Sequence, residues 1–103
     1  MAHKKSEDPL RAASNVYKLV MENEHVRVLD AHFSRGAKAV MHTHPNHVVY
    51  VITGGKLRVT LPDGKSTDFD LETGHAIWMP AGQHAAENIG FGEVRNLVVE
   101  LKE

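Results

Sequence analysis

The residues of this chain that are best suited to chemistry gather in one short stretch, MHTHPNHVVYVITGG, at positions 41–55. It places His42, His44 and His47 within six residues of one another, and an apolar run ending in two glycines follows. Alternate residues of a strand point to the same face, so His42 and His44 would project their imidazoles side by side. Two imidazoles on one strand face can bind one metal ion. The simpler alternative is a pair of solvent-exposed strand histidines.

Two more histidines are candidates for the same site. Pro45 and Asn46 interrupt a regular strand, because proline lacks a backbone donor and asparagine favours turns. This bend lets His47 return at the start of the next strand toward the same point, although it could instead face solvent or a bound ligand. His84 begins another strand after Pro-Ala-Gly, from where it could close the site. The remaining histidines lack partners at ligand spacing and are interpreted as surface or strand residues: His3, His25, His32 and His75.

The rest of the chain consists of strand-like segments separated by turn residues. These segments cover 16–22, 25–33, 47–54, 56–61, 66–74, 75–82, 84–92 and 93–101. Pro62-Asp63-Gly64 is typical of a tight turn. Short strands at this spacing predict an all-β sandwich or barrel. We predict a single domain over residues 15–103, preceded by an N-terminal arm over residues 1–14 in which residues 7–14 could form a short helix.

The spacing of these residues resembles the paired motifs of the cupin family. The first motif is resembled by Gly-x5-His-x-His and a closing glycine, at Gly36, His42, His44 and Gly54. The second is resembled by Gly-x5-Pro-x-Gly-x-His-x3-Asn, at Gly74, Pro80, Gly82, His84 and Asn88. The resemblance covers roughly residues 25–101. It implies a single-domain jelly-roll β-barrel of two antiparallel sheets, with metal ligands at His42, His44 and His84.

Two departures from the family pattern stand out. Cupins usually carry a glutamate three or four residues past the second histidine of the first motif, seven residues before the closing glycine. In this chain His47 occupies the position seven residues before Gly54. The spacing from Gly82 to His84 is also one residue shorter than usual. From its position we predict that His47 replaces the glutamate as a fourth ligand.

Imidazole ligands decide which metals suit such a site. Neutral imidazoles favour zinc, copper, iron and nickel over magnesium and calcium. We therefore expect one divalent transition metal, which is iron, copper, nickel, manganese or zinc. Without a ligating carboxylate the ion keeps its full charge and acts as a stronger Lewis acid. Four histidines closing a tetrahedron around zinc would make a structural site, whereas an octahedral ion would leave two positions open.

Three functions fit this reading. The leading one is a metalloenzyme, of the dioxygenase type, that acts on a small oxygenated molecule able to chelate the metal. The alternative is a non-enzymatic cupin that binds or senses a small molecule through its metal. A third is a structural zinc barrel without a ligand. Because one fold supports many activities, the resemblance alone does not choose among them.

Composition excludes several other partners. Twelve Lys and Arg balance thirteen Asp and Glu, giving a net charge of −1, and no basic patch indicates nucleic acid or a membrane surface. The longest apolar run, Val48–Ile52, is too short to span a bilayer. No secretory signal is visible, so we expect a cytoplasmic location. Val48, Tyr50 and Ile52 should face outward from their strand, which favours a homodimer.

Overall fold

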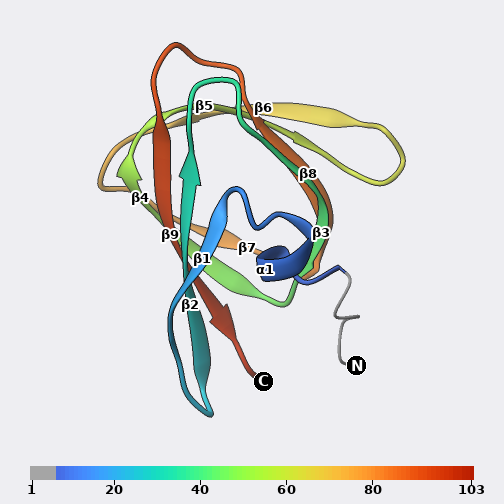
Figure 1. The fold of residues 1–103 in the computed structure, drawn as a ribbon, viewed down its shortest axis with the longest axis vertical. Coiled ribbons are helices and arrows are strands. Elements are labelled where there is room, and N and C mark those ends of the chain that lie inside the picture. The colour runs from blue at the N-terminus through green and yellow to red at the C-terminus, as the bar shows by residue number, and fades with distance from the viewer. Residues whose placement is uncertain (1–6) are drawn as a thin grey trace.

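The computed structural model describes residues 7–103 and shows a β-sheet protein with one short helix (Figure 1). Helix α1 spans Pro9–Ala12. The strands are β1 (Tyr17–Glu22), β2 (Val26–Phe33), β3 (Lys38–His44), β4 (His47–Thr53), β5 (Gly55–Thr60), β6 (Ser66–Leu71), β7 (Ala76–Met79), β8 (Gly82–Asn88) and β9 (Val94–Leu101). The predicted all-β class is therefore confirmed.

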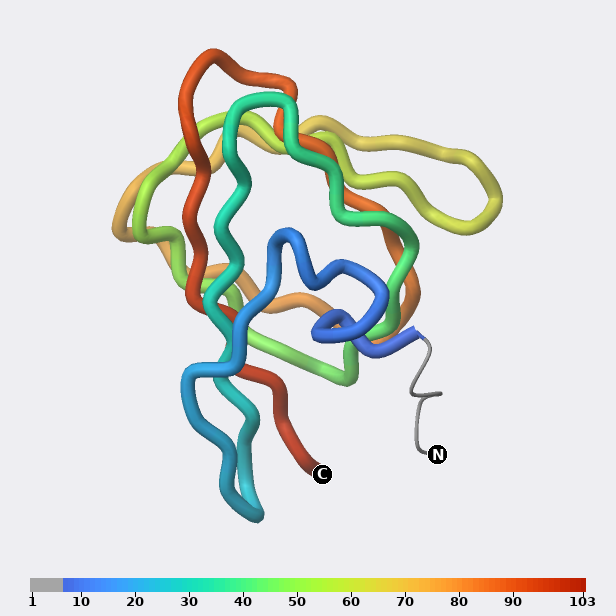
Figure 2. Tube along the Cα trace, viewed as in Figure 1, coloured from blue at the N-terminus to red at the C-terminus, as the bar shows by residue number. Residues whose placement is uncertain are grey.

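The strands form two antiparallel sheets that face each other. One has the order β1-β2-β9-β4-β7 and the other the order β3-β8-β5-β6. From β2 onward the chain passes from one sheet to the other at every connection except the hairpin between β5 and β6 (Figure 2). This alternation is that of a jelly roll, as predicted. It also brings the end of β3 and the starts of β4 and β8 together. These strand ends carry the candidate histidines.

Strand β4 shows why the sheet has one buried and one exposed face. Val51 is fully buried and Val49 packs against the core, whereas Tyr50 and Ile52 are 44% and 40% exposed. The alternation follows from the period of two along a strand. The inward and outward faces of β4 are therefore those predicted from the sequence.

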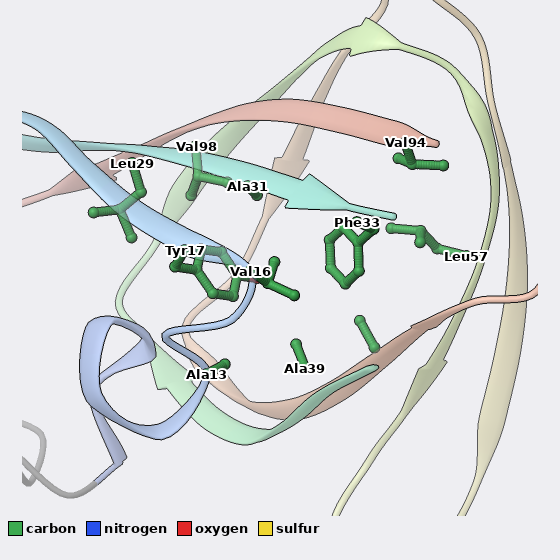
Figure 3. Close-up of a cluster of buried hydrophobic side chains, with 11 residues drawn as sticks. Ala13, Val16, Tyr17, Leu29, Ala31, Phe33, Ala39, Leu57, Val94 and Val98 are labelled. Carbon is green, nitrogen blue, oxygen red and sulfur yellow. The ribbon is translucent and has the colours of Figure 1, made fainter. Parts of the chain in front are cut away.

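The core between the sheets is built around Phe33, Leu29 and Val16 (Figure 3). Tyr17 meets Phe33 edge to face, with ring centroids 6.5 Å apart. Ala39, from the opposite sheet, completes this side of the core. The small residue leaves room for the aromatic rings that pack above it.

Two glycines are required by their positions. Gly64 has a φ of +91°, which L side chains rarely adopt, and it completes the predicted turn between β5 and β6. Asp63 caps that turn by accepting a hydrogen bond from the backbone N–H of Lys65 at 3.0 Å. Gly54 directly follows β4, at a point where a Cβ would clash with the carbonyl oxygen of Leu71. The closing glycine of the first motif thus marks a close approach of two backbone segments.

Part of the predicted N-terminal arm lies against the barrel. Asp8 caps α1 by accepting a hydrogen bond from the backbone N–H of Leu10 at 2.9 Å, and proline opens the helix. Pro9 and Ala13 are buried, and Glu7 accepts a hydrogen bond from Thr43 on β3 at 2.8 Å. The short helix is confirmed, while the boundary between arm and domain stays a prediction. Residues 1–6, including His3, lie outside the described part of the chain.

Candidate metal centre

Three of the four predicted ligands come together between the sheets. The candidate ligand nitrogens of His42, His44 and His84 all lie within 4.8 Å of one another. His42 on β3 and His84 on β8 are register partners, and their ring centroids are 4.8 Å apart. Ligand bonds of about 2.1 Å require these nitrogens within roughly 4.2 Å of one another. Side-chain movements of about one ångström would therefore be enough to gather the three nitrogens around one ion.

His47 lies beside this group but on its edge. The bend before β4 returns it to the site as predicted, and it is buried with its ring centroid 4.4 Å from that of His44. Its ring is 6.4 Å from that of His84, and it is not part of the set within 4.8 Å. A fourth ligand at His47 therefore stays a prediction.

The ring orientations of three histidines suit metal binding. His42 and His47 each donate from Nδ1 to the backbone carbonyl oxygen two residues earlier, at 2.6 and 2.8 Å. His44 donates from Nδ1 to the carboxylate Oε2 of Glu100 at 2.6 Å. A proton held on Nδ1 leaves the lone pair on Nε2, the atom that would bind a metal. These hydrogen bonds therefore fix both the tautomer and the direction of each ring.

Glu100 contacts the candidate site, and the sequence did not predict it. It is 2% exposed on the inner face of β9. Its second oxygen, Oε1, accepts a hydrogen bond from Nε of Arg27 at 2.9 Å and forms an ion pair with Nη2 of the same residue at 2.8 Å. Arg27 in turn binds Asp8 at 2.7 and 3.0 Å. Burial raises the pKa of Glu100, and Arg27 opposes that rise. The only sequence signal was the alternation along β9, which places Glu100 on the same face as Val98.

Burial favours the neutral form of three candidate ligands, His42, His47 and His84. Burial lowers the pKa of His42 and His47. Burial, and after it the neighbouring imidazoles, lowers the pKa of His84 to about 3. Neutral imidazole is the form that binds a metal, so the site needs no deprotonation of these rings at neutral pH.

Tyr17, on β1, also contacts the histidine cluster. Its hydroxyl lies 3.2 Å from Nε2 of His42. Because the Nδ1 atom of His42 carries the proton, the tyrosine hydroxyl is the donor and Nε2 the acceptor. Burial raises the pKa of Tyr17, which keeps the phenol protonated. This hydrogen bond occupies the atom of His42 that a metal would use.

The histidines adjoin an apolar cavity of about 70 Å³. Its wall includes Met79, while the adjacent Trp78 is 54% exposed on the other face of β7, so only one of the two lines the cavity as predicted. The wall holds no Asp, Glu, Lys or Arg side chain among the described residues. It consists of Tyr17, Ala31, Phe33, His44, His47, Val49, Leu57, Val59, Phe69, Leu71, Ile77, Met79, His84, Ala86, Asn96 and Val98.

Comparison with known proteins gives the family. A family profile described as the cupin domain matches residues 29–100, which is most of the chain. The chain belongs to the cupin family. No curated protein sequence gives a significant match.

Solved structures of similar proteins share this fold. A cupin domain from Bordetella pertussis Tohama I is 28% identical with a TM-score of 0.79, over 85% of this chain and 93% of its own. An RmlC-like cupin family protein from Methanocaldococcus jannaschii is 22% identical with a TM-score of 0.66, over 84% of this chain and 78% of its own. A double-stranded β-helix protein from Klebsiella pneumoniae is 23% identical with a TM-score of 0.66, over 85% of this chain and 84% of its own. The jelly-roll prediction is thus supported by both sequence and structure.

The remaining described histidines of this cupin lie on its surface. His25, His32 and His75 are each paired with a glutamate, and these three side chains are between 44% and 79% exposed. None of them belongs to the buried cluster, in agreement with the sequence analysis. The single helix of residues 7–103 is four residues long, and no helix of this part of the chain meets the length and apolarity needed to cross a membrane.

Proposed function

We propose that this cupin binds one divalent transition metal, which is iron, copper, nickel, manganese or zinc, through His42, His44, His47 and His84. The observation that carries the proposal is a cluster of four imidazoles, three of them buried with their Nδ1 atoms engaged in hydrogen bonds. All-nitrogen donors of this kind suit borderline transition metals rather than magnesium or calcium. His47 would contribute through Nε2, because its Nδ1 is engaged by the carbonyl oxygen of Pro45.

The proposed activity is that of a metalloenzyme, of the dioxygenase type, on a small oxygenated molecule that chelates the metal. A divalent ion at the site would polarise a bound oxygen and, if it is iron or copper, supply one-electron chemistry. The apolar wall of the cavity excludes water and holds the body of the substrate. Tyr17 is placed to donate a hydrogen bond at the centre, and Glu100 holds the ring of His44 in one orientation.

A binding or sensing function is the second candidate, and the make-up of the cavity favours it. Among the described residues of the cavity wall, histidine and Tyr17 are the only ionisable side chains. No carboxylate or lysine there could act as a general base. A protein that recognises a chelating molecule without transforming it needs only the ion and the apolar wall.

Elemental analysis of protein purified without an affinity tag tests the metal proposal. We expect close to one iron, copper, nickel, manganese or zinc per chain in the wild type, and strongly reduced content in His84→Ala and His47→Ala. His75→Ala, which removes an exposed histidine, is the matched control and should retain the metal. Full metal content in His47→Ala would leave a three-histidine site. Absence of metal from the wild type after reconstitution would overturn the proposal.

Oxygen uptake separates the two candidate functions. The metal-loaded protein is mixed with acetylacetone, a small chelating enol, in an oxygen electrode, and binding is measured in parallel by calorimetry. Oxygen consumption that disappears in His84→Ala supports the enzyme. Saturable binding without oxygen consumption across iron-, copper- and nickel-loaded protein favours the binding function.

A homodimer in the cytoplasm completes the proposal. Tyr50, Ile52 and Trp78 expose apolar surface on the outer face of the five-stranded sheet. Tyr50 and Trp78 lie on the paired strands β4 and β7, two register rows apart and therefore on the same face of the sheet. Exposed apolar surface of this kind supports contact with a second copy of the chain.

A further inference from the structure

Asn96 is a buried amide without the hydrogen bond that such a group normally makes. Its residue is 5% exposed on β9, and its Oδ1 has no hydrogen-bond partner among residues 7–103. Buried amides are nearly always paired, because an unpaired one destabilises the fold. Asn88 follows that rule: its side chain donates to three carbonyl oxygens and accepts a hydrogen bond from the backbone N–H of Gly90. Asn88 is therefore fully hydrogen-bonded within the fold, whereas the side-chain oxygen of Asn96 is not.

The amide of Asn96 belongs to the wall of the apolar cavity. Its register partners, Ala31 on β2 and Val51 on β4, are buried and apolar. Apart from Tyr17 and the histidines, every other described residue of the wall is apolar. No neighbouring side chain explains why an amide occupies this position, whereas a ligand in the cavity would.

Asn96 also lies at a different level of the barrel from the candidate metal ligands. It lies four residues before Glu100 on the same strand face, and Glu100 is the register partner of His47. At about 3.3 Å per residue, the backbone of Asn96 is roughly 13 Å along the strand from that level. A single ring held at the histidines by one end would present its other end toward the amide.

We propose that Asn96 recognises the ligand of this cupin, and that the ligand is a compact chelator with a largely apolar body. This ligand carries an N–H or O–H donor at the end remote from its chelating oxygens, and the donor binds Oδ1 of Asn96. The inference rests on the proposed metal-dependent function. Charged or heavily hydroxylated ligands do not fit, because the described wall offers no charged side chain and few polar partners. The cavity volume of about 70 Å³ also excludes large ligands, since drug-sized pockets measure roughly 300–1,000 Å³.

Thermal unfolding of the metal-free protein asks first whether Asn96 serves the fold. Asn96→Leu replaces the amide by a side chain of nearly the same shape, and Asn88→Leu is the matched control. We expect Asn96→Leu to unfold at the wild-type Tm or a few degrees above it, because an unpaired polar group is removed. Asn88→Leu should lower the Tm by about 10 °C or more, because four hydrogen bonds are lost. A comparable fall in Asn96→Leu would make Asn96 structural and overturn the proposal.

Two matched chelators then test recognition. Maltol and 3-hydroxy-2-methylpyridin-4-one present the same pair of chelating oxygens, and on the far side of the ring they carry an oxygen and an N–H group respectively. Their dissociation constants are measured by calorimetry on zinc-loaded wild type and Asn96→Leu. The ratio of the maltol to the pyridinone dissociation constant should be about tenfold greater in the wild type than in the variant. Comparing this ratio between the two proteins cancels the difference in the chelators' intrinsic affinity for zinc.

The outcomes separate the two proposals. Zinc retained in both proteins with an equal preference in each would overturn the role of Asn96 and leave the metal site standing. Failure of the wild type to retain zinc, measured by elemental analysis, would overturn the metal-dependent function and the ligand class together. A larger preference in the wild type, with unimpaired stability of Asn96→Leu, would establish Asn96 as a specificity residue.

Discussion

Replacing Glu100 by glutamine tests whether its carboxylate holds His44 ready to bind a metal. One carboxylate oxygen accepts a hydrogen bond from Nδ1 of His44 at 2.6 Å. The other accepts a hydrogen bond from Nε of Arg27 at 2.9 Å and forms an ion pair with Nη2 at 2.8 Å. Glutamine keeps the shape but has one oxygen and one donor group. If its NH₂ group faces His44, the ring must carry its proton on Nε2 and loses the metal-binding lone pair. If the NH₂ group faces Arg27, two donors oppose each other.

Both consequences have a measurable size. Loss of a hydrogen bond that orients a metal-binding histidine lowers metal affinity by about 10- to 100-fold. Removing one partner of a buried ion pair costs about 3–5 kcal/mol. Arg27 retains Asp8 as a partner, so we expect about 2–3 kcal/mol here, which lowers the Tm by roughly 10–20 °C in a domain of this size.

Asp30→Asn is the matched control for Glu100→Gln. Asp30 and Arg95 form an ion pair at 2.8 and 3.2 Å that joins the same two strands, β2 and β9, on the outer face of the sheet. An exposed pair contributes about 0–1 kcal/mol, and this one lies on the opposite face of the sheet from the candidate metal ligands. Zinc affinity is measured by competition calorimetry and stability by urea unfolding of metal-free protein. The reasoning is refuted if Glu100→Gln binds zinc within twofold of wild type and unfolds like Asp30→Asn.

Three further predictions concern Tyr17, the pH dependence and the apolar sheet face. Tyr17→Phe should strengthen zinc binding about fivefold by calorimetry, because the hydrogen bond to His42 must break before a metal can bind; weaker binding would instead make the phenol a ligand. Folding lowers the pKa of His84 from 6.5 to about 3, so the unfolded chain takes up a proton at a higher pH than the folded chain does. The free energy of unfolding of the metal-free protein should therefore decrease as the pH falls between these two values. Urea unfolding from pH 7.5 to 4.5 checks this, and the loss should be smaller in His84→Gln. Trp78→Lys should convert a dimer to monomers in sedimentation equilibrium, whereas Phe91→Lys, at a residue 90% exposed, should not.

The features that the sequence predicted correctly are those set by local pattern. Alternation along β4 predicted that Val49 and Val51 face inward and that Tyr50 faces outward, because side chains of a strand change face at every residue. The Pro-Asp-Gly turn and the bend before His47 followed from residues with restricted backbones. The spacing of two histidines on β3 predicted a shared face, and the structure places both in the buried cluster.

The family motifs extended this reading to one distant residue. His84 lies far along the chain from His42. Its place at the start of a strand made it a candidate, and the resemblance to the second cupin motif made it a predicted ligand. The structure then made the two residues register partners on β3 and β8. The fourth position, His47, was predicted from spacing alone, and its participation depends on ring positions that spacing does not fix.

Tertiary structure alone decided which other side chains meet the histidines. Glu100 reaches His44 from 56 residues away, and Tyr17 reaches His42 from 25 residues away. The period of β9 shows that Glu100 and Asn96 face inward, but it does not show what lies opposite them. Strand order and register set those contacts: β9 lies between β2 and β4, which places Glu100 beside His47 and Asn96 among apolar neighbours. The same alternation therefore gives one polar residue a buried ion pair and leaves the other without a partner in the cavity wall.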